Sequence, residues 1–169
     1  MRMKSDPGHA LVNRFRGGQI MAKSSASPPD NHSHAGFTRW PLWRRWFGLR
    51  SERAAARYLR KLGYRVLAHN IADAKGELDL LALDGQTIVV IEVRSTESDD
   101  FEKVAASVDS DKQRRITNAT LRFLQCRRLF NVPVRFDVLA ICWPAGCREP
   151  AIRHYRHAFE AVGRFQMHS

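Results

Sequence analysis

The chain has 169 residues, of which 28 are lysine or arginine and 17 are aspartate or glutamate, giving a formal charge of +11. This length predicts one domain with a sizeable core and argues against two. The three cysteines form no Cys-x-x-Cys pair, so neither a disulfide framework nor a cysteine zinc site is expected.

Residues 1–47 are predicted to be a disordered, basic N-terminal extension, because they are rich in Ser, Pro and Gly and poor in aliphatic residues. Residues 1–50 hold nine basic and two acidic side chains, which is +7 of the total charge. No apolar run there reaches the length of a signal peptide or a membrane helix. We therefore expect no membrane span and a cytoplasmic location.

Residues 40–47 (WPLWRRWF) form an aromatic and basic cluster at the end of this extension. Three interpretations remain open from the sequence. The aromatic rings can cover an apolar patch of the domain or contact a partner. They can also stack on bases while the arginines neutralise phosphates, or lie at a membrane interface.

The folded domain is predicted over residues 48–165. Its first helix is expected to begin at Ser51, which can act as the N-cap, and to end at Gly63. A short strand over residues 64–70 should follow. Residues 76–83 and 86–94 are two apolar runs separated by Asp84-Gly85, which predicts a hairpin with a two-residue turn.

The predicted hairpin brings acidic side chains together. With Asp84 and Gly85 as the loop, Asp79 faces Val90, Glu77 faces Glu92, and Asp79 and Glu92 become diagonal neighbours. Glu77, Asp79, Glu92 and Arg94 should then share one face. Like charges on one face are destabilising unless a cation neutralises them, so we expect Mg²⁺ or Mn²⁺ here. The alternative is a solvated, polar end of a buried strand pair.

The remaining elements complete an α/β domain. A polar loop is expected over residues 95–110, then a second long helix capped by Asp109 or Ser110. Buried strands are predicted over residues 134–142 and 152–159, with Asp137 and Arg135 as a structural ion pair. The order is α-β-β-β-α-β-β.

Asp79, followed by Glu92-Val93-Arg94, resembles the D…(D/E)-x-K signature of restriction-endonuclease-like nucleases. Further motifs occur in the order typical of the YraN family, and they are Ser51–Leu59, Gly63-Tyr64, Asn70, Gly76–Leu80, Ser107-Val108, Lys112–Ile116 and Arg135–Val138. The family is similar in fold to archaeal Holliday-junction resolvases. The resemblance implies a restriction-endonuclease-like mixed central sheet flanked by helices.

The resemblance also implies roles for individual residues. Asp79 and Glu92 would bind the metal, and Glu52 corresponds to a first-helix glutamate that reaches it in resolvase-like folds. The alternative for Glu52 is an acid favoured by the helix dipole. Arg94 stands where the nuclease signature usually has lysine, and arginine can stabilise charge but cannot usefully give up its proton. Lys112, with Arg114 and Arg115, would contact phosphate.

From these features we expect a metal-dependent endonuclease that hydrolyses phosphodiester bonds of nucleic acid, with DNA, including branched DNA, as the expected substrate. The main alternative is a non-catalytic nucleic-acid-binding or adaptor domain that retains the nuclease fold. The sequence does not decide between a monomer and a homodimer.

Overall fold

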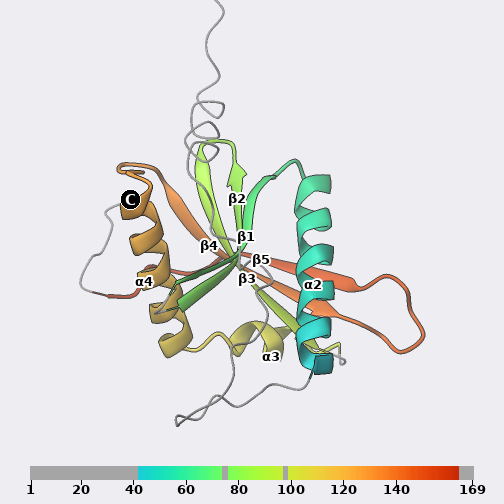
Figure 1. The fold of residues 1–169 in the computed structure, drawn as a ribbon. Helices are drawn as coiled ribbons and strands as arrows, with labels where there is room; N and C mark the ends of the chain where they lie inside the picture. The colour runs from blue at the N-terminus through green and yellow to red at the C-terminus, as the bar shows by residue number, and fades with distance from the viewer. Residues whose placement is uncertain (1–41, 74–75, 97–98, 164–169) are drawn as a thin grey trace, which may run out of the picture.

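The computed structural model describes residues 42–73, 76–96 and 99–163 and shows a five-stranded sheet between helices (Figure 1). The strands lie in the order β1-β2-β3-β4-β5. Neighbours are antiparallel except β3 and β4, which are parallel. The predicted α/β fold with a mixed central sheet is therefore confirmed, and the predicted order of elements holds with one added short helix.

The first helix, α2 (Leu42–Lys61), begins well before the predicted N-cap. Ser51 is not a cap, because it lies inside the helix, is buried, and accepts a hydrogen bond of 2.9 Å from Trp143 Nε1. The helix ends as predicted: Gly63 has φ 87°, and Tyr64 N donates to Leu59 O. Most of the predicted extension, and the side chains of residues 40–47, lie outside the described residues.

The hairpin forms with a turn one residue later than predicted. Strands β1 (Arg65–Asp73), β2 (Gly76–Asp84) and β3 (Thr87–Thr96) are consecutive neighbours. Asp84 pairs with Thr87, so the loop is Gly85-Gln86 and Gly85 takes φ 62°, as the first loop position of a type II′ turn requires. Asp84 stays in the strand because its carboxylate accepts hydrogen bonds from Arg135 and Arg156.

Because the turn moves by one residue, each residue of β2 faces a residue of β3 two positions further along than predicted. A shift of two positions leaves most side chains on their predicted faces. Leu78 is the exception. Strand alternation predicts it on the same face as Leu80, but Leu78 belongs to the same core cluster as Leu81, whereas Leu80 belongs to the opposite cluster. Pairing of β2 with β3 runs from Asp84–Thr87 to Leu80–Ile91. Beyond that pair β1 and β2 continue as a two-stranded ribbon, which can twist more strongly than a wider sheet and turn Leu78 toward α4.

The polar segment after β3, predicted to be a loop, contains a short helix. This helix, α3 (Phe101–Ala106), is capped by Asp100, whose side chain accepts from Lys103 N. Sequence periodicity could not reveal it, because the six-residue helix has no buried residue. The next helix, α4 (Ser110–Cys126), is capped by Asp109 as predicted.

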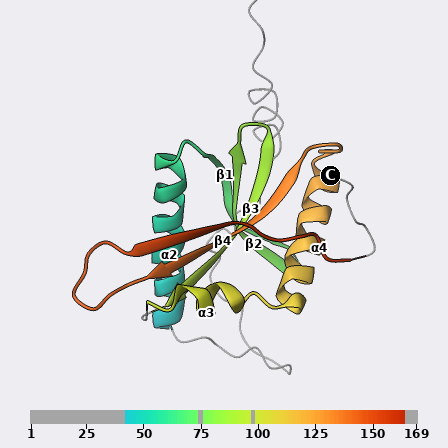
Figure 2. The same cartoon turned by 180° about the vertical axis from the view of Figure 1, so that it is seen from behind.

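Two apolar clusters cover the two faces of the sheet. One contains residues of α4 and the segment before it together with one face of β2, β3 and β4. The other contains residues of α2 and the opposite face of the same strands. Figures 1 and 2 show α2 and α4 on opposite sides of the strands, with α3 near the end of β3. Within the described residues, no helix is long and apolar enough to cross a membrane.

A buried polar network joins the last two strands to the hairpin turn. Asp137, on β4 (Val134–Cys142), is fully buried and receives hydrogen bonds from Arg135 Nε (2.9 Å), His154 Nε2 (2.8 Å) and His157 N (3.1 Å). His154 and His157 lie on β5 (Ala151–Phe159). Arg135 also donates to Asp84 and Tyr64. The predicted Arg135–Asp137 ion pair is confirmed and is part of a larger network.

We predict that Arg135→Leu lowers the free energy of unfolding by about 3 kcal/mol, because it leaves the Asp137 carboxylate buried without its main cation. Urea denaturation followed by circular dichroism measures this. Arg114→Leu is the control, because Arg114 pairs with Asp111 at an exposed site and should change stability by less than about 0.5 kcal/mol. Equal effects of the two substitutions would contradict the structural importance of the network.

The same network predicts a pH dependence. Burial raises the pKa of Asp137, but hydrogen bonds from His154, Arg135 and His157 N outweigh burial and leave the pKa below its usual value. A carboxyl with a lowered pKa in the folded state stabilises the fold above its unfolded pKa, and this contribution is lost as the pH falls through the folded pKa. Stability should therefore decrease below about pH 4, and Asp137→Asn should flatten that decrease.

Candidate functional site

The candidate site lies where β2 and β3 separate. Asp79 directly precedes Leu80, which forms the last pair of the two strands with Ile91. Its carboxylate Oδ2 accepts a hydrogen bond of 2.8 Å from the backbone N–H of Val93. Glu92, the residue between Ile91 and Val93, is 4 % exposed. The end of the strand pairing thus brings both predicted metal ligands to one place.

Glu52 approaches this place from α2. Its carboxylate accepts a hydrogen bond from the side chain of Asn70. It also lies close enough to Asp79 and Glu77 for their negative charges to raise its pKa. Asn70 has φ 51°, a conformation that asparagine tolerates better than most residues, in the middle of β1. The structure therefore places Glu52 beside Asp79, and Asn70 is a neighbour for which the sequence suggested no role.

Lys112 reaches the same place from the first turn of α4. Its Nζ lies 2.9 Å from Glu92 Oε1, and its side chain is 23 % exposed. The sequence placed Lys112 on a surface that contacts phosphate, together with Arg114 and Arg115. In the structure Lys112 lies at the carboxylate site, since the Asp109 cap fixes the start of α4 and the lysine side chain extends from this first turn to Glu92.

Arg94 also contacts Glu92, but imperfectly. Its Nε lies 3.5 Å from Glu92 Oε1. That nitrogen is buried, and among the described residues it makes no hydrogen bond. A buried donor without an acceptor is costly. An oxygen of a bound phosphate would provide the missing acceptor.

The electrostatics show an excess of negative charge at Asp79. Burial, and then repulsion by Glu92, raise the pKa of the Asp79 carboxyl to about 7, although the Val93 N–H and Lys112 act in the opposite direction. Burial also raises the pKa of Glu52, with Asp79 and Glu77 adding to the effect. Lys112 and Arg94 therefore compensate Glu92 better than they compensate Asp79.

These residues meet the chemical requirement of a hard divalent cation. Mg²⁺ is usually bound by one or two carboxylates, with water and substrate oxygens completing the shell. Asp79 and Glu92 offer two carboxylates, and the raised pKa of Asp79 marks a place where added positive charge would be stabilising. Among the described residues, no group of three or more histidine, cysteine, aspartate or glutamate side chains is arranged so that it could hold a metal ion by itself.

Other residues named from the sequence lie outside this arrangement. Arg114 forms an exposed ion pair with Asp111, with Nη2 to Oδ1 at 2.6 Å. Arg115 is exposed, and Glu77 is an exposed side chain at the edge of the site whose charge adds to the raised pKa of Glu52 and of Asp79. The site as the structure shows it therefore consists of Glu52, Asp79, Glu92, Arg94 and Lys112.

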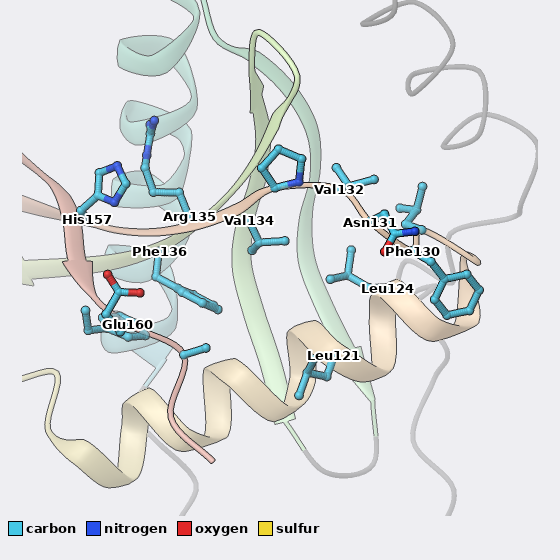
Figure 3. A pocket seen from close by; sticks show the side chains of 14 residues that line it. Leu121, Leu124, Phe130, Asn131, Val132, Val134, Arg135, Phe136, His157 and Glu160 are labelled. Carbon is cyan, nitrogen blue, oxygen red and sulfur yellow. The ribbon is translucent and has the colours of Figure 1, made fainter. Parts of the chain in front are cut away.

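A cavity lies elsewhere in the domain. It has a volume of about 690 Å³ and lies between the end of α4, the start of β4 and the end of β5, lined mainly by apolar side chains such as Leu124, Phe130 and Phe136 (Figure 3). None of the predicted site residues lines it. The candidate chemistry therefore depends on the carboxylate cluster and not on this cavity.

Comparisons with known proteins identify relatives of this chain. The model of the family described as "Uncharacterised protein family UPF0102" matches residues 51–141. A UPF0102 protein of Syntrophus aciditrophicus is 44% identical over 119 residues, which cover 69% of this chain and 91% of the relative. One of Rhodopirellula baltica is 42% identical, covering 69% and 71%, and one of Bordetella avium is 38% identical, covering 69% and 84%.

The raised pKa of Asp79 predicts the effect of removing its charge. A carboxyl whose pKa is raised by folding lowers the stability of the protein as the pH rises from the carboxyl's unfolded pKa to its folded pKa. Asp79→Asn should therefore stabilise the metal-free protein, with a gain that grows between about pH 4 and pH 7 and reaches on the order of 2 kcal/mol above it. Thermal unfolding in EDTA at several pH values measures this gain. The exposed Asp99→Asn is the control, and a destabilising Asp79→Asn at pH 8 would show that the carboxylate is structural.

Proposed function

The chain belongs to the UPF0102 family, the YraN family that its motifs resemble, and from the geometry of its carboxylate site we propose that it is a metal-dependent nuclease that hydrolyses phosphodiester bonds of nucleic acid, with DNA as the expected substrate. The observation that carries the proposal is the closeness of Asp79 and Glu92 at the end of the β2–β3 pairing, with Glu52 beside Asp79 and two cations on Glu92. Membership of the family does not supply this function, because the family is described as uncharacterised.

Asp79 and Glu92 would hold Mg²⁺ or Mn²⁺, with Glu52 close enough to contribute through water. A bound ion would supply Lewis-acid activation of the phosphate and of the attacking water. The chain prepares this position at a cost, because burial, and then repulsion by the neighbouring carboxylates, raise the pKa of Asp79 in the metal-free protein. Strained electrostatics of this kind are typical of functional sites.

The two cations have separate roles in this proposal. Arg94 supplies a fixed positive charge and a buried Nε that has no hydrogen-bond acceptor among the described residues, so it can bind an oxygen of the scissile phosphate. Lys112 compensates Glu92 and holds it in place at 2.9 Å. Charge that develops on the phosphate in the transition state would then be stabilised mainly by Arg94.

A second candidate function is nucleic-acid binding without cleavage. One observation favours it: Lys112 and Arg94 both contact Glu92, so this carboxylate is already compensated without a metal ion. A domain that kept the fold and replaced the ion by internal cations would look like this. Metal binding distinguishes the two candidates.

The metal site is tested by calorimetry of the full chain with Mn²⁺. Native protein should bind the ion, and Asp79→Asn and Glu92→Gln should each abolish binding or weaken it by at least about tenfold. Asp99→Asn should bind as the native protein does, because Asp99 is exposed and outside the site. Binding that is undetectable, or that survives both site substitutions, would favour the non-cleaving candidate.

Catalysis is tested with linear, nicked and branched DNA, and with RNA, in Mg²⁺ or Mn²⁺. Arg94→Ala should reduce cleavage by on the order of a hundredfold, the effect of losing one transition-state donor, with a much smaller effect on substrate affinity. Arg94→Lys should retain substantial activity because it keeps the charge. If the native protein cleaves no substrate with either metal, the nuclease proposal is wrong.

A further inference from the structure

We propose that the solvent-facing side of α2 is the surface along which the sugar-phosphate backbone of the nucleic acid lies on its way to the carboxylate site. The sequence directed attention to α4 and to the N-terminal extension, and neither contains this surface. The inference rests on the proposed nucleic-acid partner, but it does not require that the protein cleaves it.

The surface consists of basic side chains at helical spacing. Arg53, Arg57 and Arg60 follow one another by four and three residues, which keeps them within about 60° of each other around the helix. All three are exposed, as are the next cations along the chain, Lys61 and Arg65. We call these five residues the α2 basic stripe.

Three members of the stripe, Arg57, Arg60 and Lys61, are not neutralised by a carboxylate of the described residues. In that part of the chain, the ion pairs involve α3, α4 and the strands. On α4, by contrast, Arg114 is paired with Asp111 and Lys112 with Glu92. Uncompensated cations in a row attract a polyanion more strongly than cations that already have partners.

The position of the stripe links it to the site. Arg53 follows Glu52, and the two are close enough for their charges to interact. From Arg53 to Arg60 the helix rises about 10 Å, which is about three phosphate steps of one strand of a duplex. A backbone that follows the stripe toward the start of α2 would therefore arrive beside Glu52 and Asp79.

A stable helix supports the stripe. The opposite side of α2 is packed into the core through Ala55 and Leu59, both 0% exposed. Ser51 is fixed to Trp143 by a hydrogen bond. The backbone that carries the stripe is thus held against the sheet, and substitutions of the arginines need not disturb the fold.

The test is binding of the full chain to a fluorescent DNA duplex in EDTA, measured over a range of KCl concentrations. Arg53→Gln/Arg57→Gln/Arg60→Gln should weaken binding by at least about tenfold and reduce the slope of log Kd against log [KCl] by about 2–3, since each phosphate contact contributes about 0.9. The matched control, Lys103→Gln/Arg114→Gln/Arg115→Gln, removes three charges from α3 and α4 and should have a much smaller effect.

Two outcomes would overturn the inference. One is a control variant that loses as much affinity and slope as the stripe variant, which would assign binding to α4 or to total charge. The other is binding to phosphatidylserine vesicles that depends on the stripe while duplex binding does not, which would assign the stripe to a membrane surface next to the exposed Leu49 and Leu62.

The proposed nuclease can fail separately. Asp79→Asn should abolish cleavage and keep the duplex affinity of the native protein, because Asp79 lies outside the stripe. If the native protein binds duplex through the stripe and cleaves nothing, the inference holds and the nuclease proposal does not. Circular dichroism of each variant confirms that α2 is intact.

Discussion

The candidate site depends on how far β3 is paired on each of its two sides. Its parallel pairing with β4 continues to Thr96–Cys142, whereas its antiparallel pairing with β2 ends at Leu80–Ile91. Backbone N–H groups beyond that point on the β2 side need another acceptor, and the Asp79 carboxylate satisfies that of Val93. Because the hydrogen bonding between β2 and β3 ends early, the Asp79 carboxylate is fixed beside Glu92. A hairpin paired to its end would have closed this position.

The negative charge at the candidate site is less well compensated than the buried charge elsewhere in the domain. On both faces of the sheet, leucine, isoleucine and valine side chains are buried against helices, and the buried Asp137 is fully compensated by its partners. At Asp79 the compensation is incomplete, and the pKa of this carboxyl rises to about 7. Two acids in opposite electrostatic situations thus occur in one small domain. Asp137 stabilises the fold, and Asp79 is the acid that the proposed function assigns to a metal ion.

Much of the fold could be predicted from the sequence, because apolar alternation and cap residues are local signals. The two strands around Asp84-Gly85, the Asp109 cap and the Gly63 stop were all visible in this way.

Three features of the fold could not be predicted from local signals. Ser51 has the chemistry of a cap, but burial against Trp143 decided its position. The turn moved because Arg135, 51 residues away, binds Asp84. Leu78 changed face because a two-stranded ribbon twists. Each depends on contacts between distant parts of the chain. The same limit applied to Lys112, whose approach to Glu92 requires the packing of α4 against the sheet.

The Arg135 network has a further consequence for how the domain moves. It ties Asp84, at the turn between β2 and β3, to β4 and β5 through Arg135 and Arg156. The opposite end of β2, at Gly76, pairs with β1 and lies next to Ala119 and Arg122 of α4. Local opening should therefore begin at the Gly76 end of β2 and stop before the turn at Asp84. β2 would then move away from β3 at Asp79, while the other strands of the sheet stay paired. Fraying of one hairpin would then widen the space at Asp79 without unfolding the domain.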